Sequence, residues 1–248
     1  MIVPDLAVWA WLLLGLSAFV VGVSKTAIPG VNTLSVAVFA AVLPARESTG
    51  TLLVLLIVAD LFAIVSYRRD ANWRALVRLA PAVLVGLVLG AVFLAVANDE
   101  WVSRVIGVIL LAVVAFTLLR RRFAPVVAGA GPHPVAAAGY GTLGGFTTMV
   151  ANAAGPVMSM YFLASRFAVK EFLGTAAWFF FLVNITKLPF SIGLGIITPA
   201  GLVLDAILVP LVVVGALLGR WWANRLDQRL FERLVIVFTI VGAVYLLF

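Results

Sequence analysis

Cysteine is absent from the 248 residues, histidine occurs once, and charged residues make up only 11% of the chain. The lack of cysteine excludes disulfides, thiolate metal sites and cysteine nucleophiles. The single histidine, His133, stands between Pro132 and Pro134, the acids are dispersed, and no serine or threonine has an evident base beside it. We therefore expect no catalytic residue, no metal site and no cofactor, and an intramembrane enzyme is the least favoured function.

Hydrophobic residues are what the chain has in excess. They make up 65% of the sequence, and the mean hydropathy is +1.22. Most long stretches are apolar around their whole circumference, which is typical of helices buried in lipid. Apolar runs predict ten helical segments, at 5–23, 30–43, 48–67, 75–97, 102–119, 134–150, 156–166, 171–190, 200–219 and 230–247.

The second segment in each set of five is short. As helices, residues 30–43 rise about 21 Å and residues 156–166 about 17 Å. The hydrocarbon core of a bilayer is about 30 Å thick, so both segments are expected to be half-spanning or re-entrant. Irregular backbone at such depth is tolerated only against protein or a water-filled cavity. The breaks at 27–30 and 151–156 are therefore expected to line something polar.

The two halves of the chain share one layout of residues. A shift of 124 residues pairs Arg46, Glu47, Gly50, Thr51 and Asp60 with Lys170, Glu171, Gly174, Thr175 and Asn184. After a five-residue lengthening, a shift of 129 pairs Pro81, Gly86, Gly90 and Arg104 with Pro210, Gly215, Gly219 and Arg233. Each half holds an odd number of segments, so the second copy is expected upside down, a recurrent construction in secondary transporters. The predicted fold is an all-α polytopic membrane protein of two inverted repeats, 1–122 and 134–248, joined by a cytoplasmic linker at 123–133.

Most of the 17 basic residues follow the third, fifth, seventh and ninth segments. Because basic residues are retained on the cytoplasmic side, both chain ends are expected outside the cytoplasm. The net charge of +7 then reflects topology and contacts with anionic membrane lipids, and no nucleic-acid partner is expected. The GxxxG-like spacing of Gly86 and Gly90 fits packing within the chain or in a homodimer.

Two lysines and one acid interrupt apolar sequence. An ionisable group within a bilayer costs about 3 kcal/mol on insertion scales, so each needs a reason. Lys25 lies just before the first break, where backbone amides and a helix dipole also favour an anion, and this position favours binding over snorkelling to the surface. Lys187 has polar neighbours at Asn184 and Thr186, and for it the two alternatives are equally open.

Asp60 is interpreted as the only acid in the middle of a predicted span. A buried carboxyl group could carry a proton during transport. A hydrogen-bonded or salt-bridged helix contact, for example with one of the lysines, is at least as good an explanation.

The second break is the richer one in hydroxyl, amide and small residues. Such residues let a ligand approach the backbone, although they also suit helix packing alone. Pro156 would fit the first turn of the following helix, and it aligns with Asn32 in the first half. The residues expected to bind a small anion are Ser24, Lys25, Thr26, Gly30, Asn32, Thr147, Thr148, Asn152, Gly155, Asn184 and Lys187, and Asp60 is the candidate for proton coupling.

Four stretches resemble the TauE/SafE family of sulfite and organosulfonate exporters. They are Gly22-Val23-Ser24-Lys25-Thr26, Asn152-Ala153-Ala154-Gly155-Pro156, Gly174-Thr175-Ala176-Ala177-Trp178-Phe179-Phe180 and Asn184-Ile185-Thr186-Lys187. The resemblance covers essentially the whole chain. It implies a permease of the bacterial inner membrane for small sulfur-containing anions, usually associated with export.

The expected function is thus a secondary transporter of small anions such as sulfite or organosulfonates. Two lysines against one membrane-embedded acid favour an anion over a cation, and broken helices favour alternating access. A passive anion channel is the main alternative, because the sequence hardly separates a channel from a carrier.

Overall fold

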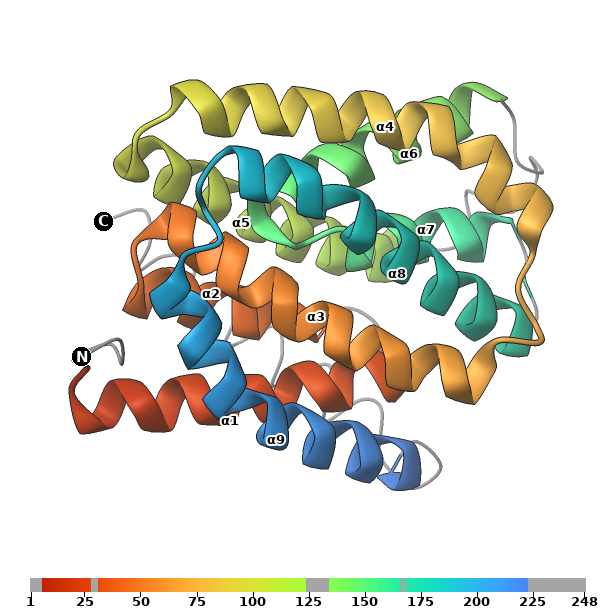
Figure 1. Ribbon diagram of the computed structural model, residues 1–248. Coiled ribbons are helices and arrows are strands. Elements are labelled where there is room, and N and C mark those ends of the chain that lie inside the picture. Colours follow the sequence, from red (N-terminus) through yellow and green to blue (C-terminus); the bar gives the residue numbers. More distant parts are fainter. Residues whose placement is uncertain (1–5, 28–30, 124–133, 166, 168, 223–248) are drawn as a thin grey trace.

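The structure is a computed structural model that describes residues 6–27, 31–123, 134–165, 167 and 169–222. This part of the chain contains nine helices and no strand, which confirms the all-α fold (Figure 1). In chain order the helices are α1 Val8–Thr26, α2 Asn32–Val42, α3 Ala45–Tyr67, α4 Trp73–Val96, α5 Asp99–Phe123, α6 Pro134–Ala151, α7 Gly155–Ala164, α8 Val169–Gly193 and α9 Pro199–Trp222. The predicted segment at 230–247 and residues 124–133 of the predicted linker lie outside the described residues.

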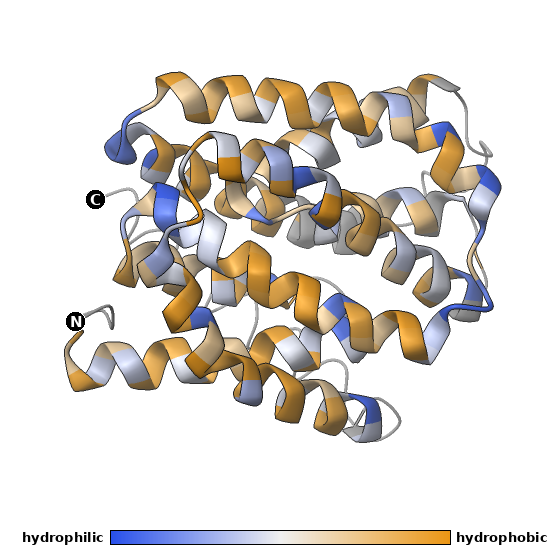
Figure 2. Cartoon of the chain, in the orientation of Figure 1, coloured by the Kyte–Doolittle hydropathy of each residue, from blue (hydrophilic) through white to orange (hydrophobic). Residues whose placement is uncertain are grey.

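Five helices, α1, α3, α4, α8 and α9, are long and apolar enough to cross a membrane. Hydrophobic residues dominate their lengths, whereas hydrophilic residues gather at the two ends of the bundle (Figure 2). Large apolar side chains such as Val88, Leu89 and Val92 of α4 are about half exposed, as lipid-facing residues are. The chain is therefore a polytopic membrane protein.

The two short segments form short helices. α2 has 11 residues and α7 has 10, so they rise about 16 Å and 15 Å, half of the hydrocarbon thickness. Proline occurs at two kinds of position in these helices. Pro81, Pro189 and Pro210 lie inside long helices, whereas Pro156 occupies the first turn of α7, where its missing N–H removes no helical hydrogen bond.

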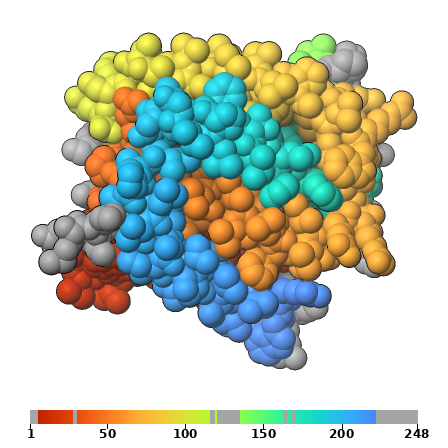
Figure 3. Space-filling view, in the orientation of Figure 1, coloured from red at the N-terminus to blue at the C-terminus, as the bar shows by residue number. Residues whose placement is uncertain are grey.

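Helices that the sequence pairs between the halves run in opposite directions. In Figure 1, α3 runs from left to right and α8 from right to left, and the same holds for α9 and α4. α3 and α8 pack together at the centre, while α8 and α9 flank α3 on one face (Figure 3). This is the arrangement that an inverted repeat requires; the division into two repeats of five segments stays a prediction.

The halves are also interlocked. The most extensive helix contacts are those of α1 with α9 and of α6 with α4. In each pair one helix comes from the first half and the other from the second half. A Cβ atom on Gly86 would lie 2.1 Å from the carbonyl oxygen of Thr142, and one on Gly215 would lie 2.1 Å from that of Phe19. Gly90 likewise faces Met149 of α6. The GxxxG-like spacing therefore serves packing within the chain, and a homodimer stays a prediction without that support.

A matching pair of caps joins the halves at both ends. Asn72 and Thr198 precede α4 and α9, and each side chain accepts a hydrogen bond from a backbone N–H in the first turn. The same side chains donate to acids of the other half, Asn72 to Glu171 and Thr198 to Glu47, each at 2.7 Å. The paired positions Glu47 and Glu171 thus have equivalent roles in the fold.

We expect Gly86→Ala to destabilise the protein by about 1–3 kcal/mol, because α4 and α6 would have to separate to admit one methyl group. Gly139→Ala on α6 is the matched control, since nothing lies within 4 Å of a Cβ there. That change should leave stability unchanged or raise it slightly, because alanine favours a helix over glycine. Thermal unfolding in detergent would compare them, and equal midpoints would contradict the packing role of Gly86.

Candidate functional site

Both predicted breaks are present, and they meet at the centre of the molecule. α1 ends at Thr26 and α2 begins at Asn32, while α6 ends at Ala151 and α7 begins at Gly155. Asn152, in the second break, has a φ of 51°, a left-handed conformation that asparagine adopts more readily than most residues. Asn152 therefore lets the chain reverse its course without a glycine. It also supplies an amide side chain that bonds to the surrounding groups.

Asn152 connects four helices. Its amide nitrogen donates to the carbonyl oxygen of Thr49 at 2.9 Å, and its Oδ1 accepts a hydrogen bond from Lys187 Nζ. Its own carbonyl oxygen accepts from Nδ2 of Asn32 at 3.2 Å. The two breaks are therefore bonded to each other, and both are tied to α3 and α8.

Lys25 and Asp60 form a buried ion pair. Lys25 Nζ lies 2.6 Å from Asp60 Oδ1, and the side chains are 10% and 0% exposed. Asn184, the residue that the repeat pairs with Asp60, donates from Nδ2 to Asp60 Oδ2 at 2.7 Å. The lysine also lies 4.3 Å from the ring centroid of Phe180, a cation–π contact. The salt-bridge alternative for Asp60 is thus what the structure shows, and snorkelling is excluded for Lys25.

Lys187 is the second buried lysine, and it is fully enclosed. Its Nζ donates to the carbonyl oxygen of Thr148 at 2.6 Å and to Asn152. Snorkelling is therefore excluded for this lysine too. No carboxylate of the described residues lies within ion-pair distance of it, because Asp60 is bound to Lys25. Among the described residues, only neutral oxygens surround this amino group.

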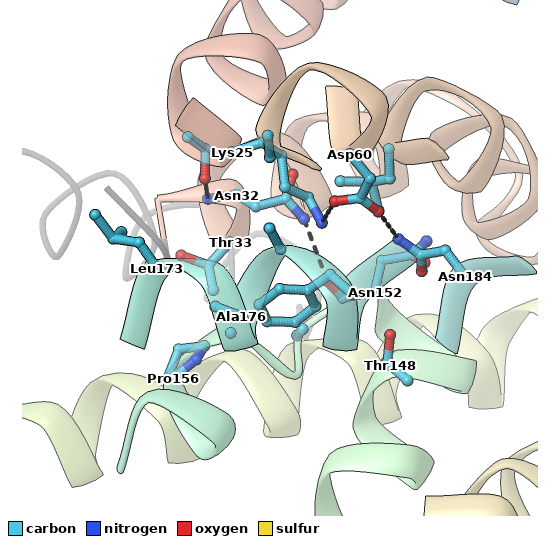
Figure 4. A pocket seen from close by; sticks show the side chains of 17 residues that line it. Lys25, Asn32, Thr33, Asp60, Thr148, Asn152, Pro156, Leu173, Ala176 and Asn184 are labelled. Carbon is cyan, nitrogen blue, oxygen red and sulfur yellow. Dashed lines mark hydrogen bonds and ion pairs between the residues drawn. The ribbon is translucent and has the colours of Figure 1, made fainter. Parts of the chain in front are cut away.

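A cavity of about 40 Å³ lies between the two breaks (Figure 4). The first residues of both short helices line it, Asn32 and Thr33 of α2 and Gly155 and Pro156 of α7. Helix N-termini carry partial positive charge, so two of them facing one cavity favour an anion. The N–H of Asn32 is itself bonded to Ser24 Oγ at 3.1 Å, so the helix dipoles and not free N–H groups at these first residues carry the effect. The Oδ1 atom of Asn32 is buried without a hydrogen-bond partner among the described groups.

The structure brings most of the predicted residues together. Those that line the cavity are Ser24, Lys25, Asn32, Asp60, Thr148, Asn152, Gly155 and Asn184. Lys187 does not line it but holds Thr148 and Asn152, which do.

Three predicted residues are not at the cavity or cannot be placed. Thr26 hydrogen-bonds the carbonyl oxygen of Ala216 at 3.0 Å, in the contact between α1 and α9. Thr147 bonds back to the carbonyl oxygen of Leu143 within α6. Gly30 lies outside the described residues.

Sequence reasoning missed several residues. Thr33 and Phe180 line the cavity. Thr33 directly follows the predicted residue Asn32, and Phe180 ends one of the four stretches that resemble the family, so these positions were the only signals in the sequence. Sequence reasoning also passed over a second acid within a span, because it considered only acids in the middle of one. Asp205 lies in α9, inside a candidate span, and is 2% exposed. The signal was present, because this acid interrupts the apolar run at 200–219.

These observations define a polytopic helical membrane protein with a buried polar site, containing two lysines, at two helix breaks. Comparison with family models identifies the family. The sulfite exporter TauE/SafE model matches residues 14–246, nearly the whole chain, and the protein belongs to that family. It is accordingly a membrane transporter of a sulfite-exporter family rather than a member of an enzyme family. Searches of curated proteins and of solved structures gave no match.

Removing one partner of the central ion pair should destabilise the protein strongly. We expect Lys25→Met and Asp60→Asn each to cost about 3–5 kcal/mol, because each leaves a buried charge without its partner. The double variant should cost less than the sum of the two. Thermal unfolding of the four proteins measures the coupling.

The exposed pair Arg104 and Glu100 supplies the matched control, since its side chains are 53% and 66% exposed at the same N···O distance of 2.6 Å. Its coupling should stay below about 1 kcal/mol. Additive losses at Lys25 and Asp60 would contradict the ion pair.

Proposed function

We propose that the protein is a secondary transporter that exports small sulfur-containing anions such as sulfite or short organosulfonates. The observation that carries the proposal is the cavity on which two helix N-termini and Lys25 converge, with Lys187 just behind its wall. Half-helices whose N-termini point at an anionic group near the centre of the membrane recur in secondary transporters.

The charges of the site support an anion with one negative charge. Lys25 and Asp60 neutralise each other, so protonation of Lys187 gives the buried polar cluster one excess positive charge. An unbalanced charge inside a membrane is unfavourable, and a bound monoanion would neutralise it. The free amide oxygen of Asn32 can accept a hydrogen bond from a protonated oxyanion.

The size of the cavity favours a compact substrate. One water needs about 10–15 Å³ on this measure, so a volume of about 40 Å³ accommodates roughly three waters. A trigonal or tetrahedral oxyanion fits such a space after losing most of its hydration. A long-chain sulfonate would require the cavity to open.

The charge distribution supports the proposed orientation in the bacterial inner membrane. The loop between α3 and α4, with Arg68 and Arg69, lies at the same end of the bundle as Arg220 in the last turn of α9 (Figure 1). The acids Asp99 and Glu100 begin α5 at the opposite end. Under the positive-inside rule the arginine end faces the cytoplasm and α1 begins outside it, with contacts to anionic lipids at the inner surface.

Counterflow separates a carrier from a passive channel. Proteoliposomes loaded with unlabelled sulfite or methanesulfonate should transiently accumulate the labelled anion from outside, because a carrier exchanges one for the other across its alternating site. A channel shows equilibration without accumulation. That result would replace the carrier by the channel alternative.

Neutralising Lys187 should weaken anion binding. A unit charge about 8 Å away contributes about 2 kcal/mol at an effective dielectric constant of 20, so Lys187→Gln should raise the dissociation constant for sulfite roughly 30-fold. Glutamine keeps a donor for Thr148 and Asn152. Arg104→Gln is the matched charge control at an exposed position and should leave affinity unchanged. Calorimetry on the purified proteins would measure both, and equal affinities of wild type and Lys187→Gln would refute the role of this lysine.

A further inference from the structure

The second intramembrane acid, Asp205, lies away from the proposed anion site. It is the seventh residue of α9, roughly 9 Å along the helix from Pro199. The residue is 2% exposed, and neither carboxyl oxygen has a hydrogen-bond partner among the described residues. A buried carboxyl group with both oxygens unpaired is rare in folded proteins and calls for a physical explanation.

No basic group on the neighbouring described helices balances Asp205. α9 packs against α1 and α3, and the ionisable groups of those helices have other partners. On α1, Lys25 pairs with Asp60 of α3. The remaining groups are Arg46, which bonds the Ala97 carbonyl oxygen, Glu47, which accepts from Thr198, and Tyr67, which bonds the Thr26 carbonyl oxygen. On α9 itself, Arg220 is fifteen residues further along the helix.

An isolated carboxylate in apolar surroundings is strongly disfavoured, so such a group takes up a proton and becomes neutral. Asp60 differs, because Lys25 and Asn184 occupy its two oxygens and stabilise its charge. A metal cation would need several oxygen ligands, and no group of three or more acids or histidines exists in the described part of the chain. The ligand that fits Asp205 is a single proton.

We propose that Asp205, and not Asp60, binds the proton that is exchanged during transport. The protonated carboxylic acid stays buried where α9 meets α1 and α3. Loss of the proton to water leaves a carboxylate that has to be hydrated, so α9 must move until Asp205 reaches water. This inference rests on the proposed transport function and adds to it the coupling ion and the group that binds it.

The surroundings place polar groups between Asp205 and the nearer end of the bundle. Gly201, one helical turn before Asp205, faces the hydroxyl group of Thr51 on α3. The hydrogen bond between Thr198 and Glu47 lies at the start of the same helix, at the end of the bundle. Water that reaches Asp205 when α9 moves is therefore expected to enter from this end.

The surroundings also link the proton to the anion. Thr26 Oγ1 bonds the Ala216 carbonyl oxygen of α9 at 3.0 Å, and Thr26 directly follows Lys25. A Cβ on Gly219 would lie 2.5 Å from Thr26 Oγ1, so α9 and the last turn of α1 are in close contact. A movement of α9 therefore displaces the turn that carries Lys25.

The test compares two modes of transport in proteoliposomes with methanesulfonate, whose charge does not change with pH. Counterflow needs no proton exchange, whereas net flux driven by an imposed pH gradient does. The membrane potential is clamped with valinomycin and equal potassium on both sides. Asp205→Asn preserves shape and removes proton exchange, and Glu100→Gln neutralises an exposed acid as the matched control.

We expect wild type and Glu100→Gln to show counterflow and a flux that follows the pH gradient. Asp205→Asn should retain counterflow within about twofold and lose the response to the gradient. An unchanged response, or loss of counterflow in Asp205→Asn that elutes as folded protein, would overturn the role of Asp205 alone. Absence of counterflow of both methanesulfonate and sulfite in the wild type would overturn the proposed function, and this inference with it.

A second measurement does not depend on the folding of a variant. The infrared spectrum of the wild type in membranes at neutral pH should contain the C=O band of a protonated, buried carboxylic acid. That band should disappear as the medium is made alkaline. Absence of the band at neutral pH would overturn the proposal, because Asp205 would then be ionised in its buried position.

Discussion

Helix breaks at mid-membrane depth leave backbone polar groups that lipid cannot satisfy, and the centre of this protein is built around that constraint. Asn152 meets it by bonding to the first break through Asn32, to α3 through the Thr49 carbonyl oxygen, and to α8 through Lys187. Two of these residues, Asn32 and Asn152, also line the cavity. The proposed site for a polar solute thus lies where the fold has to place polar side chains in any case.

The buried charges divide into a balanced set and an unbalanced one. Lys25 and Asp60 neutralise each other, with Asn184 completing the carboxylate. Lys187 has only neutral oxygens around it among the described residues. The first set holds α1, α3 and α8 together whether or not a solute is bound, because its charges are already paired. The second, Lys187, has no acid beside it, which is why the proposed function assigns it a role in binding an anion.

Each half of the chain buries part of its surface against the other half. α1 packs on α9 and α6 on α4, through backbone contacts that only glycine allows at Gly22, Gly86, Gly145 and Gly215. At these glycines the two backbones are so close that one helix cannot slide along the other unless the pair first separates. Each helix is therefore expected to move together with its partner from the other half.

Sequence alone determined the membrane class, the all-α fold, the positions of both breaks and the opposite course of the halves, because these follow from hydropathy, segment length and residue spacing. It also identified eight of the residues that line the cavity, since a polar residue in an apolar run needs a reason. Tertiary structure decided the partners. Only the packing of the helices brought Asp60 of α3 to Asn184 of α8 and Lys25 of α1, and placed Thr26 in the contact between α1 and α9. It also left Asp205 without a partner among the described residues. Contacts between different helices depend on how the helices pack and not on the residue spacing within any one of them.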